Sequence, residues 1–321
     1  MRNAAIRWGS FAVAMLAGSV LHAGLVITPT FTANFNTNFG ANAVAAQNAW
    51  ISAAGVFENN FTDNIHINIT VDAVAGTGVF GQSSTFLGST SYANLINLMV
   101  ADSTTPDDAT ALAAGGSLFG PDPTGGAGKW WVSRAEAKAI GLIADDLNTD
   151  GTTTFGAGHP FTFSGPIAPG TYDFRGIVAH EISEVMGHLG ISGGTIGSFP
   201  NSYSLVDLFS YGPSNTRVLT NGGANPGFFS IDGGNTLTKQ FNDAANNGLD
   251  TRDWRAVTPY DPDSFNQFSN PNIVNPVTTL DLRLMDVIGY DGLGVPEPSS
   301  MLLLGAGLAV GMVLRRKKIA R

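Results

Sequence analysis

The sequence predicts one α+β domain, residues 24–294, between two short targeting segments at residues 1–23 and 295–321. Three observations support this fold class. Residues 25–71 have the pattern of a strand, a helix and a second strand. Residues 173–186 have helical periodicity with one apolar face. The content of 43% hydrophobic and 13% charged residues places the chain among globular proteins, and we find no fixed-period repeat.

The first half of the domain alternates between the two regular periodicities. Residues 25–31 and 65–71 alternate apolar with polar side chains, so both segments are predicted to be strands. Between them, residues 41–59 carry apolar side chains near helical spacing. Residues 92–101 and 133–145 are also predicted to be helical.

The second half contains one long loop, one central helix and a final helix. Residues 115–128 are rich in Gly and Pro, which indicates a surface loop. The helix at 173–186 is expected to end at Gly187. Residues 228–242 are predicted to form short strands around an Asp-Gly-Gly turn, and residues 278–289 a final amphipathic helix.

The N-terminus has the three-part layout of a secretory signal peptide. Arg2 and Arg7 precede the apolar run 8–21, which closes on the small residues Ala23 and Gly24. The run is too short to span a bilayer comfortably. We therefore expect export with cleavage near Ala23; the alternative is a buried N-terminal helix.

The C-terminus resembles a PEP-CTERM sorting signal. Residues 295–299 read Val-Pro-Glu-Pro-Ser, and the apolar residues 301–314 and the basic residues 315–318 follow them. The resemblance implies that an exosortase cleaves near the Pro-Glu-Pro tripeptide. It also implies transient anchoring in the inner membrane through residues 301–314, with the basic cluster in the cytoplasm. The expected location is the envelope or the exterior of a Gram-negative bacterium.

Charge and cysteine content exclude several classes of partner and ligand. The net charge is −9, and the body between the targeting segments carries nine basic and 24 acidic residues. This balance argues against a nucleic-acid partner and fits cation binding better. Because the chain has no cysteine, disulfides and thiolate ligands are excluded, and any metal site must use His, Asp, Glu or backbone oxygens.

The motif that carries chemistry is His-Glu-x-x-Glu, formed by His180, Glu181 and Glu184 on the central predicted helix. Because residues four apart share a helix face, His180 and Glu184 offer an imidazole and a carboxylate to one point, as two ligands of one zinc ion require. Glu181 lies about 100° round the helix, beside that point. The alternative is a buried histidine capped by a carboxylate, with both glutamates facing water.

With Gly187 seven residues after His180, the motif resembles the metzincin form of the zincin metallopeptidases. The run 180–187 also resembles a family of PEP-CTERM-associated zinc metalloproteases that have glutamate as the second ligand. Further segments that support this resemblance are 203–209, 229–234, 253–254 and 281–290. The resemblance implies a zincin-like fold and zinc-dependent hydrolysis of a protein or peptide substrate. In that role His180 and Glu184 hold the metal, and Glu181 is the catalytic base.

The sequence departs from the metzincin pattern in two respects. Glu184 stands where the usual signature has a second histidine, and a carboxylate neutralises more of the ion's charge than an imidazole does. Gly190 occupies the position of the third ligand, and no Met-turn is recognisable. The alternative function is therefore a non-catalytic cell-surface or extracellular-matrix protein with a degenerate zincin fold.

The third metal ligand is left open by the sequence. His188 lies eight residues from His180, about 12 Å along a straight helix, so it reaches the same ion only if the chain bends between them. Asp207 is a short acid in an apolar segment shortly after the helix. His159 is a weaker alternative. A loop or strand histidine such as His159 or His66 more often contacts no metal.

A calcium loop is the second metal candidate. Asp146, Asn148 and Asp150 match the opening of such a loop, but its closing position is Ala157. A turn rich in Asn, Asp and Gly explains the segment equally well.

Other polar residues after the motif receive simpler interpretations. Tyr203 or Tyr211 could donate a hydroxyl to a developing oxyanion. Four aspartates of the C-terminal third are expected to be solvated turn residues: Asp250, Asp253, Asp261 and Asp263.

Overall fold

The structure is a computed structural model. It describes residues 24–220, 227–242, 250–257 and 259–293. The segments predicted to be a signal peptide and a membrane anchor, residues 1–23 and 301–314, lie outside the described residues. None of the helices in the described part is both long enough and apolar enough to span a bilayer.

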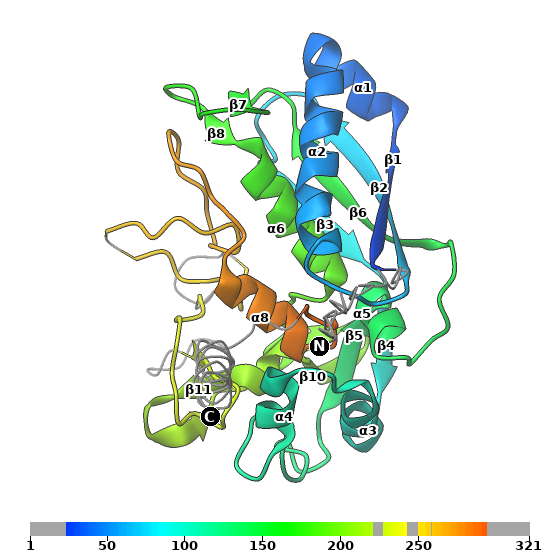
Figure 1. Cartoon of the computed structure of the whole chain (residues 1–321), viewed down its shortest axis with the longest axis vertical. Helices are drawn as coiled ribbons and strands as arrows, with labels where there is room; N and C mark the ends of the chain where they lie inside the picture. Colours follow the sequence, from blue (N-terminus) through cyan, green and yellow to red (C-terminus); the bar gives the residue numbers. More distant parts are fainter. Residues whose placement is uncertain (1–23, 221–226, 243–249, 258, 294–321) are drawn as a thin grey trace, which may run out of the picture.

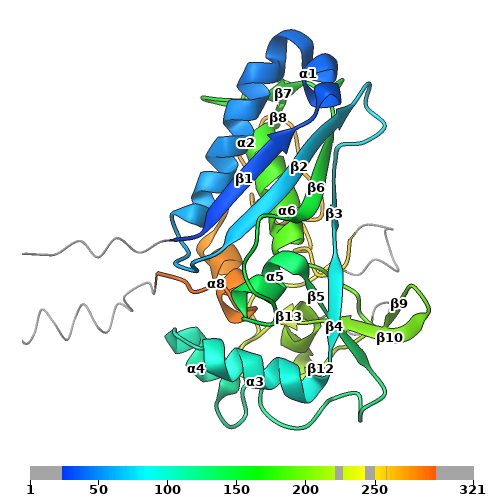
Figure 2. The same ribbon diagram turned by 90° about the vertical axis from the view of Figure 1, so that its right-hand side faces the viewer.

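The larger sheet has four strands in the order β1-β2-β6-β3 (Figure 2). β1 (Val26–Phe31), β2 (His66–Val74) and β6 (Thr149–Gly156) run parallel, and β3 (Gly81–Thr85) pairs antiparallel with β6 at the edge. Every second side chain of β2 is buried, and these are Ile67, Ile69, Val71 and Ala73. The sheet therefore has one apolar face, as the alternation in the sequence predicted.

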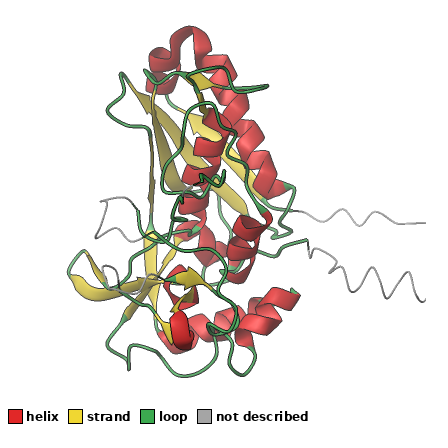
Figure 3. Ribbon diagram, turned by 90° about the vertical axis from the view of Figure 1, so that its left-hand side faces the viewer, coloured by secondary structure: helices red, strands yellow, loops and turns green. Residues whose placement is uncertain are grey.

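Two helices lie side by side on this face (Figures 1 and 3). α2 (Ala43–Glu58) contacts β1, and α6 (Phe174–Met186) contacts β6 and β3. Trp50 of α2 is fully buried, and its Nε1 donates to Thr153 Oγ1 of β6 over 3.2 Å. The core of the domain lies between these helices and the sheet.

A second group of short strands and helices lies beneath the larger sheet (Figure 1). Its sheet has the order β4-β5-β10-β9, with bounds Leu87–Thr90, Lys129–Ser133, Phe199–Ser204 and Gly194–Ile196. The other α-helices are α1 (Ala33–Phe39), α3 (Tyr92–Asp102), α4 (Pro106–Leu112), α5 (Arg134–Ala139) and α8 (Thr279–Val287). The remaining elements are η1 (Gly40–Asn42), β7 (Phe161–Thr162), β8 (Tyr172–Asp173), η2 (Val206–Phe209), β11 (Ser210–Gly212), η3 (Pro213–Asn215), β12 (Thr216–Arg217) and β13 (Phe228–Phe229).

This mixed architecture agrees with the predicted α+β class, with three local differences. Residues 133–145 form only the short helix α5, which is followed by Gly141 at a φ of +70°. Residues 228–242 form one short strand and isolated bridges, because Phe241 pairs with Trp254 of a later segment. β3 and β4 were not predicted, since their residues are mainly Gly, Ser, Thr and Gln without an apolar alternation.

α6 ends where the sequence predicts, at Gly187. This glycine has a φ of +118°, and its N–H bonds to the Glu184 carbonyl. The next residue, His188, donates its backbone N–H to the Ser183 carbonyl over 2.9 Å, which closes the helix end. A Cβ at position 187 would lie 3.0 Å from the Glu136 carboxyl carbon.

Gly187→Ala is expected to lower the free energy of unfolding by about 1–3 kcal/mol, because alanine is strained at this φ and lacks room beside Glu136. The control is Gly55→Ala in α2, where a Cβ would meet only Asn59 Nδ2 at 3.9 Å. Gly55→Ala should raise the free energy of unfolding by about 0.5–1 kcal/mol. Urea unfolding measures both changes. If the two substitutions changed the free energy of unfolding in the same direction, this account would be contradicted.

Candidate metal centre

α6 brings three of the predicted site residues together. One donor atom from each of His180, Glu181 and Glu184 can be chosen so that all three lie within 4.8 Å of one another. His180 Nε2 lies 3.7 Å from Glu184 Oε1, as expected for residues one helical turn apart. The two glutamates are buried, with 5% and 8% of their surface exposed, so the alternative in which they face water is wrong.

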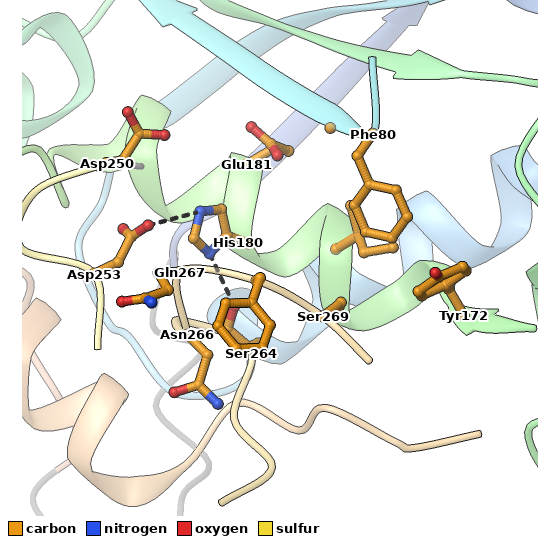
Figure 4. Close-up of a pocket in the computed structure, with 13 residues that line it drawn as sticks. Phe80, Tyr172, His180, Glu181, Asp250, Asp253, Ser264, Asn266, Gln267 and Ser269 are labelled. Carbon is orange, nitrogen blue, oxygen red and sulfur yellow. Dashed lines mark hydrogen bonds and ion pairs between the residues drawn. The ribbon is translucent and has the colours of Figure 1, made fainter. Parts of the chain in front are cut away.

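Ser264 fixes the orientation of the His180 ring. His180 Nδ1 lies 2.9 Å from the Ser264 carbonyl oxygen (Figure 4). Because a carbonyl oxygen only accepts, Nδ1 carries the proton and Nε2 faces the carboxylates. Burial would lower the pKa of His180, but the negative charges of Asp253 and Glu184 raise it well above its usual value. The same ring orientation is typical of metal-ligating histidines.

The two glutamates of α6 differ in their surroundings. Ser83 Oγ of β3 donates to Glu184 Oε2 over 2.7 Å. Burial favours the neutral acid, but His180 and Ser83 lower the pKa of Glu184 below its usual value. In contrast, burial and the adjacent Glu184 raise the pKa of Glu181 well above its usual value. Environments that separate two carboxyl pKa values are typical of sites where one group stays charged and the other carries a proton.

Glu181 has no structural partner for one of its oxygens. Its Oε2 is buried and makes no hydrogen bond to any described residue. The side chain lies against Gly81 of β3, where a Cβ would come within 2.2 Å of Glu181 Oε1. Glycine is therefore required at position 81 if Glu181 is to keep this place.

Asp253 joins the cluster from a distant segment. Its Oδ2 lies 3.7 Å from His180 Nε2, and only 2% of the residue is exposed. The prediction of a solvated turn is therefore wrong for Asp253. It is also wrong for Asp263, which is buried and pairs with Lys239 over 2.8 Å. The neighbouring Trp254 is a signal that could have indicated a buried segment here.

Asp250 and Asp261 fit the prediction of exposed turn residues better. Both are exposed, although Asp250 also lies at the edge of the pocket beside His180.

A pocket of about 360 Å³ opens beside this cluster (Figure 4). Its charged side is formed by His180, Glu181, Asp250 and Asp253. The other side is apolar and largely aromatic, with Phe80, Tyr172, Ile177 and Phe268. Gly81 also lines the pocket, so the edge strand β3 begins in its wall.

The structure does not bring Asp207 to the cluster. Asp207 is fully buried, and its Oδ1 accepts from Arg252 Nε over 2.8 Å. Its Oδ2 accepts from the backbone N–H groups of Ser192 and Ser204 over 2.9 and 2.8 Å. Both oxygens are thus occupied by donors of the protein, which corrects the expectation that Asp207 is the third ligand.

His188 also has a structural role. Its Nε2 donates to the Arg252 carbonyl over 2.9 Å, and its ring stacks on Phe265 at 4.5 Å between centroids. Burial and the nearby charge of His180 lower the pKa of His188 to about 4, so the ring is neutral. Since Nε2 bonds to the main chain and the ring is held by stacking, the expectation of a metal ligand is corrected here as well.

The other residues considered from the sequence lie outside the pocket. His159 bonds through Nε2 to a main-chain carbonyl, and His66 pairs with Asp145. Tyr203 packs against Trp130 in the second sheet, and Tyr211 lies under a guanidinium group, so neither is placed to donate to an oxyanion.

The segment that matched a calcium loop is held by cations of the protein itself. Asp146 pairs with Arg134, and the buried Asp150 pairs with Lys138 over 2.8 Å. Asn148 bonds through its backbone N–H and its side chain to Asp146. These contacts favour the turn over the calcium loop.

Comparison with known proteins identifies only the C-terminal signal. A family model described as the PEP-CTERM protein-sorting motif matches residues 294–317. The motif implies an exported protein of Gram-negative bacteria that is processed by exosortase, so these predictions are confirmed. No curated protein and no solved structure matches the chain. The zincin-like fold and the zinc site therefore stay predictions.

The low pKa of His188 predicts a loss of stability in mild acid. Because the folded-state pKa of about 4 lies below the ordinary value of 6.5, the unfolded chain takes up the proton first, and stability declines as the pH falls from 6.5 to 4. The contribution is roughly 3 kcal/mol. In His188→Gln, which can still donate to the Arg252 carbonyl, this part of the decline should vanish.

Urea unfolding of both proteins with a chelator present, at several values between pH 4 and 7, measures this difference. His180 is present in both proteins, and its raised pKa changes stability with pH in the opposite direction. This contribution to the pH dependence largely cancels when the two proteins are compared. Parallel stability curves would show that His188 is not the buried neutral base described above.

Proposed function

We propose that this exported protein is a zinc-dependent peptidase that hydrolyses peptide bonds in a protein or peptide substrate. The observation that carries the proposal is the arrangement on α6. His180 and Glu184 direct donor atoms to a shared point. The buried Glu181 lies beside this point, its Oε2 has no hydrogen-bond partner among the described residues, and His180 and Glu181 both line an open pocket.

The residues of the cluster fit a zinc ion. Catalytic zinc sites use His nitrogen and carboxylate oxygen, with few protein ligands and an open position. The Nδ1 bond of His180 to a main-chain carbonyl is the supporting contact that such histidines usually make. The carboxylate of Glu184, kept ionised by its surroundings, supplies the second donor.

Glu181 is the catalytic base in this proposal. A bound zinc ion would polarise the substrate carbonyl and lower the pKa of a water molecule. Glu181 Oε2 accepts a proton from the attacking water and then passes it to the amine of the leaving peptide. Burial and the adjacent Glu184 raise the pKa of Glu181, which makes its ionised carboxylate a stronger base.

The edge strand β3 supports a peptide as substrate. Among the described strands, β3 pairs only with β6 in the larger sheet. Its other edge can pair with an extended peptide through main-chain hydrogen bonds. Because Gly81 of this strand lines the pocket, a peptide paired along β3 would pass beside Glu181.

One observation favours the alternative of a non-catalytic surface or matrix protein. Glu184 replaces a neutral imidazole with a carboxylate, so the ion would keep less positive charge to activate water. Reproducible, chelator-sensitive peptide cleavage by the purified protein would exclude this alternative.

Glu181→Gln should lower the rate of peptide cleavage by about 10²–10⁴-fold, since the amide cannot accept the proton, while zinc content stays near one per chain. His180→Ala should lose both zinc and cleavage. Elemental analysis and a fluorogenic peptide assay measure the two quantities. Cleavage that survives Glu181→Gln at the original rate would exclude this mechanism.

Gly81→Ala should also impair cleavage, because its Cβ would displace the Glu181 carboxylate. A shift of about 1 Å in a reacting group can lower a rate by roughly 10²-fold. The matched control is Gly88→Ala in β4, where a Cβ meets no atom within 4 Å, and which should retain its rate. Equal rates for the two variants would contradict the packing of Glu181 against β3.

A further inference from the structure

We propose that Asp253 is the third protein ligand of the metal, so that His180, Glu184 and Asp253 hold the ion and Glu181 remains the base. This inference rests on the proposed function. It assigns a role to a residue that lies far from the motif in the sequence and close to it in the fold.

The distances suit one shared ion. Glu184 Oε1 and Asp253 Oδ2 each lie 3.7 Å from His180 Nε2. Zinc bonds to nitrogen and oxygen are about 2.0–2.2 Å long, so two ligands of a tetrahedral ion lie about 3.3–3.5 Å apart. Each of these two distances is therefore within a few tenths of an ångström of the separation between two ligands of one ion. Both carboxylates approach Nε2, the ring nitrogen that Ser264 leaves free.

The buried Asp253 carboxylate has no polar partner other than His180 among the described residues. Only 2% of the residue is exposed, and among the described residues its carboxylate makes one polar contact, with His180. A carboxylate taken out of water needs a cation or several hydrogen bonds. Glu181 and Glu184 also surround the single imidazole, so three acids share one basic group. A divalent cation would give these carboxyl groups a shared partner.

The residues on either side of Asp253, Arg252 and Trp254, are held by contacts with other segments. Arg252 has a φ of +71°, a left-handed conformation that costs about 1–3 kcal/mol for a residue other than glycine. Asp207 binds its guanidinium and His188 binds its carbonyl. On the other side, the buried Trp254 donates through Nε1 to Asp281 over 2.6 Å. Such backbone strain persists where the surrounding contacts fix the chain. Here these contacts hold Arg252 and Trp254, and the residue between them, Asp253, points at His180.

A competing ligand set uses only α6. One donor atom from each of His180, Glu181 and Glu184 lies within 4.8 Å of the other two, and Asp253 is not part of this group. In that set Glu181 is a ligand and the site has no base. The two sets therefore differ in which single substitution removes the metal, Asp253→Asn or Glu181→Gln.

Zinc binding to the purified full-length protein tests the choice. Asp253→Asn keeps the size of the side chain and should weaken zinc affinity by more than about 100-fold, since loss of an outer partner alone weakens affinity about 10- to 100-fold. Glu181→Gln should bind zinc nearly as the unmodified protein does. The control Asp250→Asn removes a charge at the edge of the same pocket and should weaken affinity only about two- to threefold. Competition with a chromogenic chelator gives the affinities.

Cobalt(II) in place of zinc gives a second measurement that does not depend on activity. The visible absorption of the bound cobalt reports its ligands, and it should change in Asp253→Asn but not in Asp250→Asn. Circular dichroism of the metal-free variants checks that each is folded. If Asp253→Asn unfolds, Asp253→Ala and Asp253→Glu are measured in the same way.

The outcomes separate this inference from the proposed function. If the unmodified protein binds no zinc, the proposed function fails first. If it binds zinc, and Asp253→Asn binds equally well while Glu181→Gln does not, the inference is overturned and the ligands are those of α6 alone. Loss of zinc in Asp253→Asn, with binding kept in Glu181→Gln and Asp250→Asn, supports Asp253 as a ligand.

Discussion

The burial of charge on α6 is the constraint on which the surrounding structure depends. Eleven of the thirteen residues of this helix are buried, and Glu181 and Glu184 are among them. Ionisable groups taken out of water require partners, and these come from three directions. β3 supplies Ser83, the helix itself supplies His180, and the C-terminal third supplies the Ser264 carbonyl that orients the imidazole. Glu181 Oε2 has no hydrogen-bond partner among the described residues, and Glu181 lines the pocket.

Arg252, the residue before Asp253, is held in place by two residues outside the cluster. Asp207 and His188 lie on separate segments, and both bind Arg252, one through the guanidinium and the other through the carbonyl. Their contacts with Arg252 fix a strained backbone immediately before Asp253. Residues with typical ligand chemistry can thus act indirectly on the proposed metal site, by positioning the chain that carries a neighbouring carboxylate.

Local patterns in the sequence predicted much of the fold and the part of the site that lies on one helix. β1, β2, α2, α6 and α8 follow from periodicity, and the spacing of His180 and Glu184 follows from one helical turn. Asp253 could not be found in this way, because its approach to His180 depends on how the C-terminal segment folds back over α6. β3 could not be predicted because its Gly, Gln, Ser and Thr residues carry no apolar alternation, and the place of Gly81 in the pocket wall depends on the tertiary fold.

The long connection between the two halves of the centre has a consequence for when the site exists. His180 and Ser264 are 84 residues apart, and the carbonyl that orients the imidazole arrives only when the last third of the domain has packed on α6. A chain that has made the His-Glu-x-x-Glu helix but has not completed this packing contains the motif without the assembled centre. Any activity would therefore begin with the completion of folding, which separates synthesis of the motif from the moment at which neighbouring proteins are exposed to it.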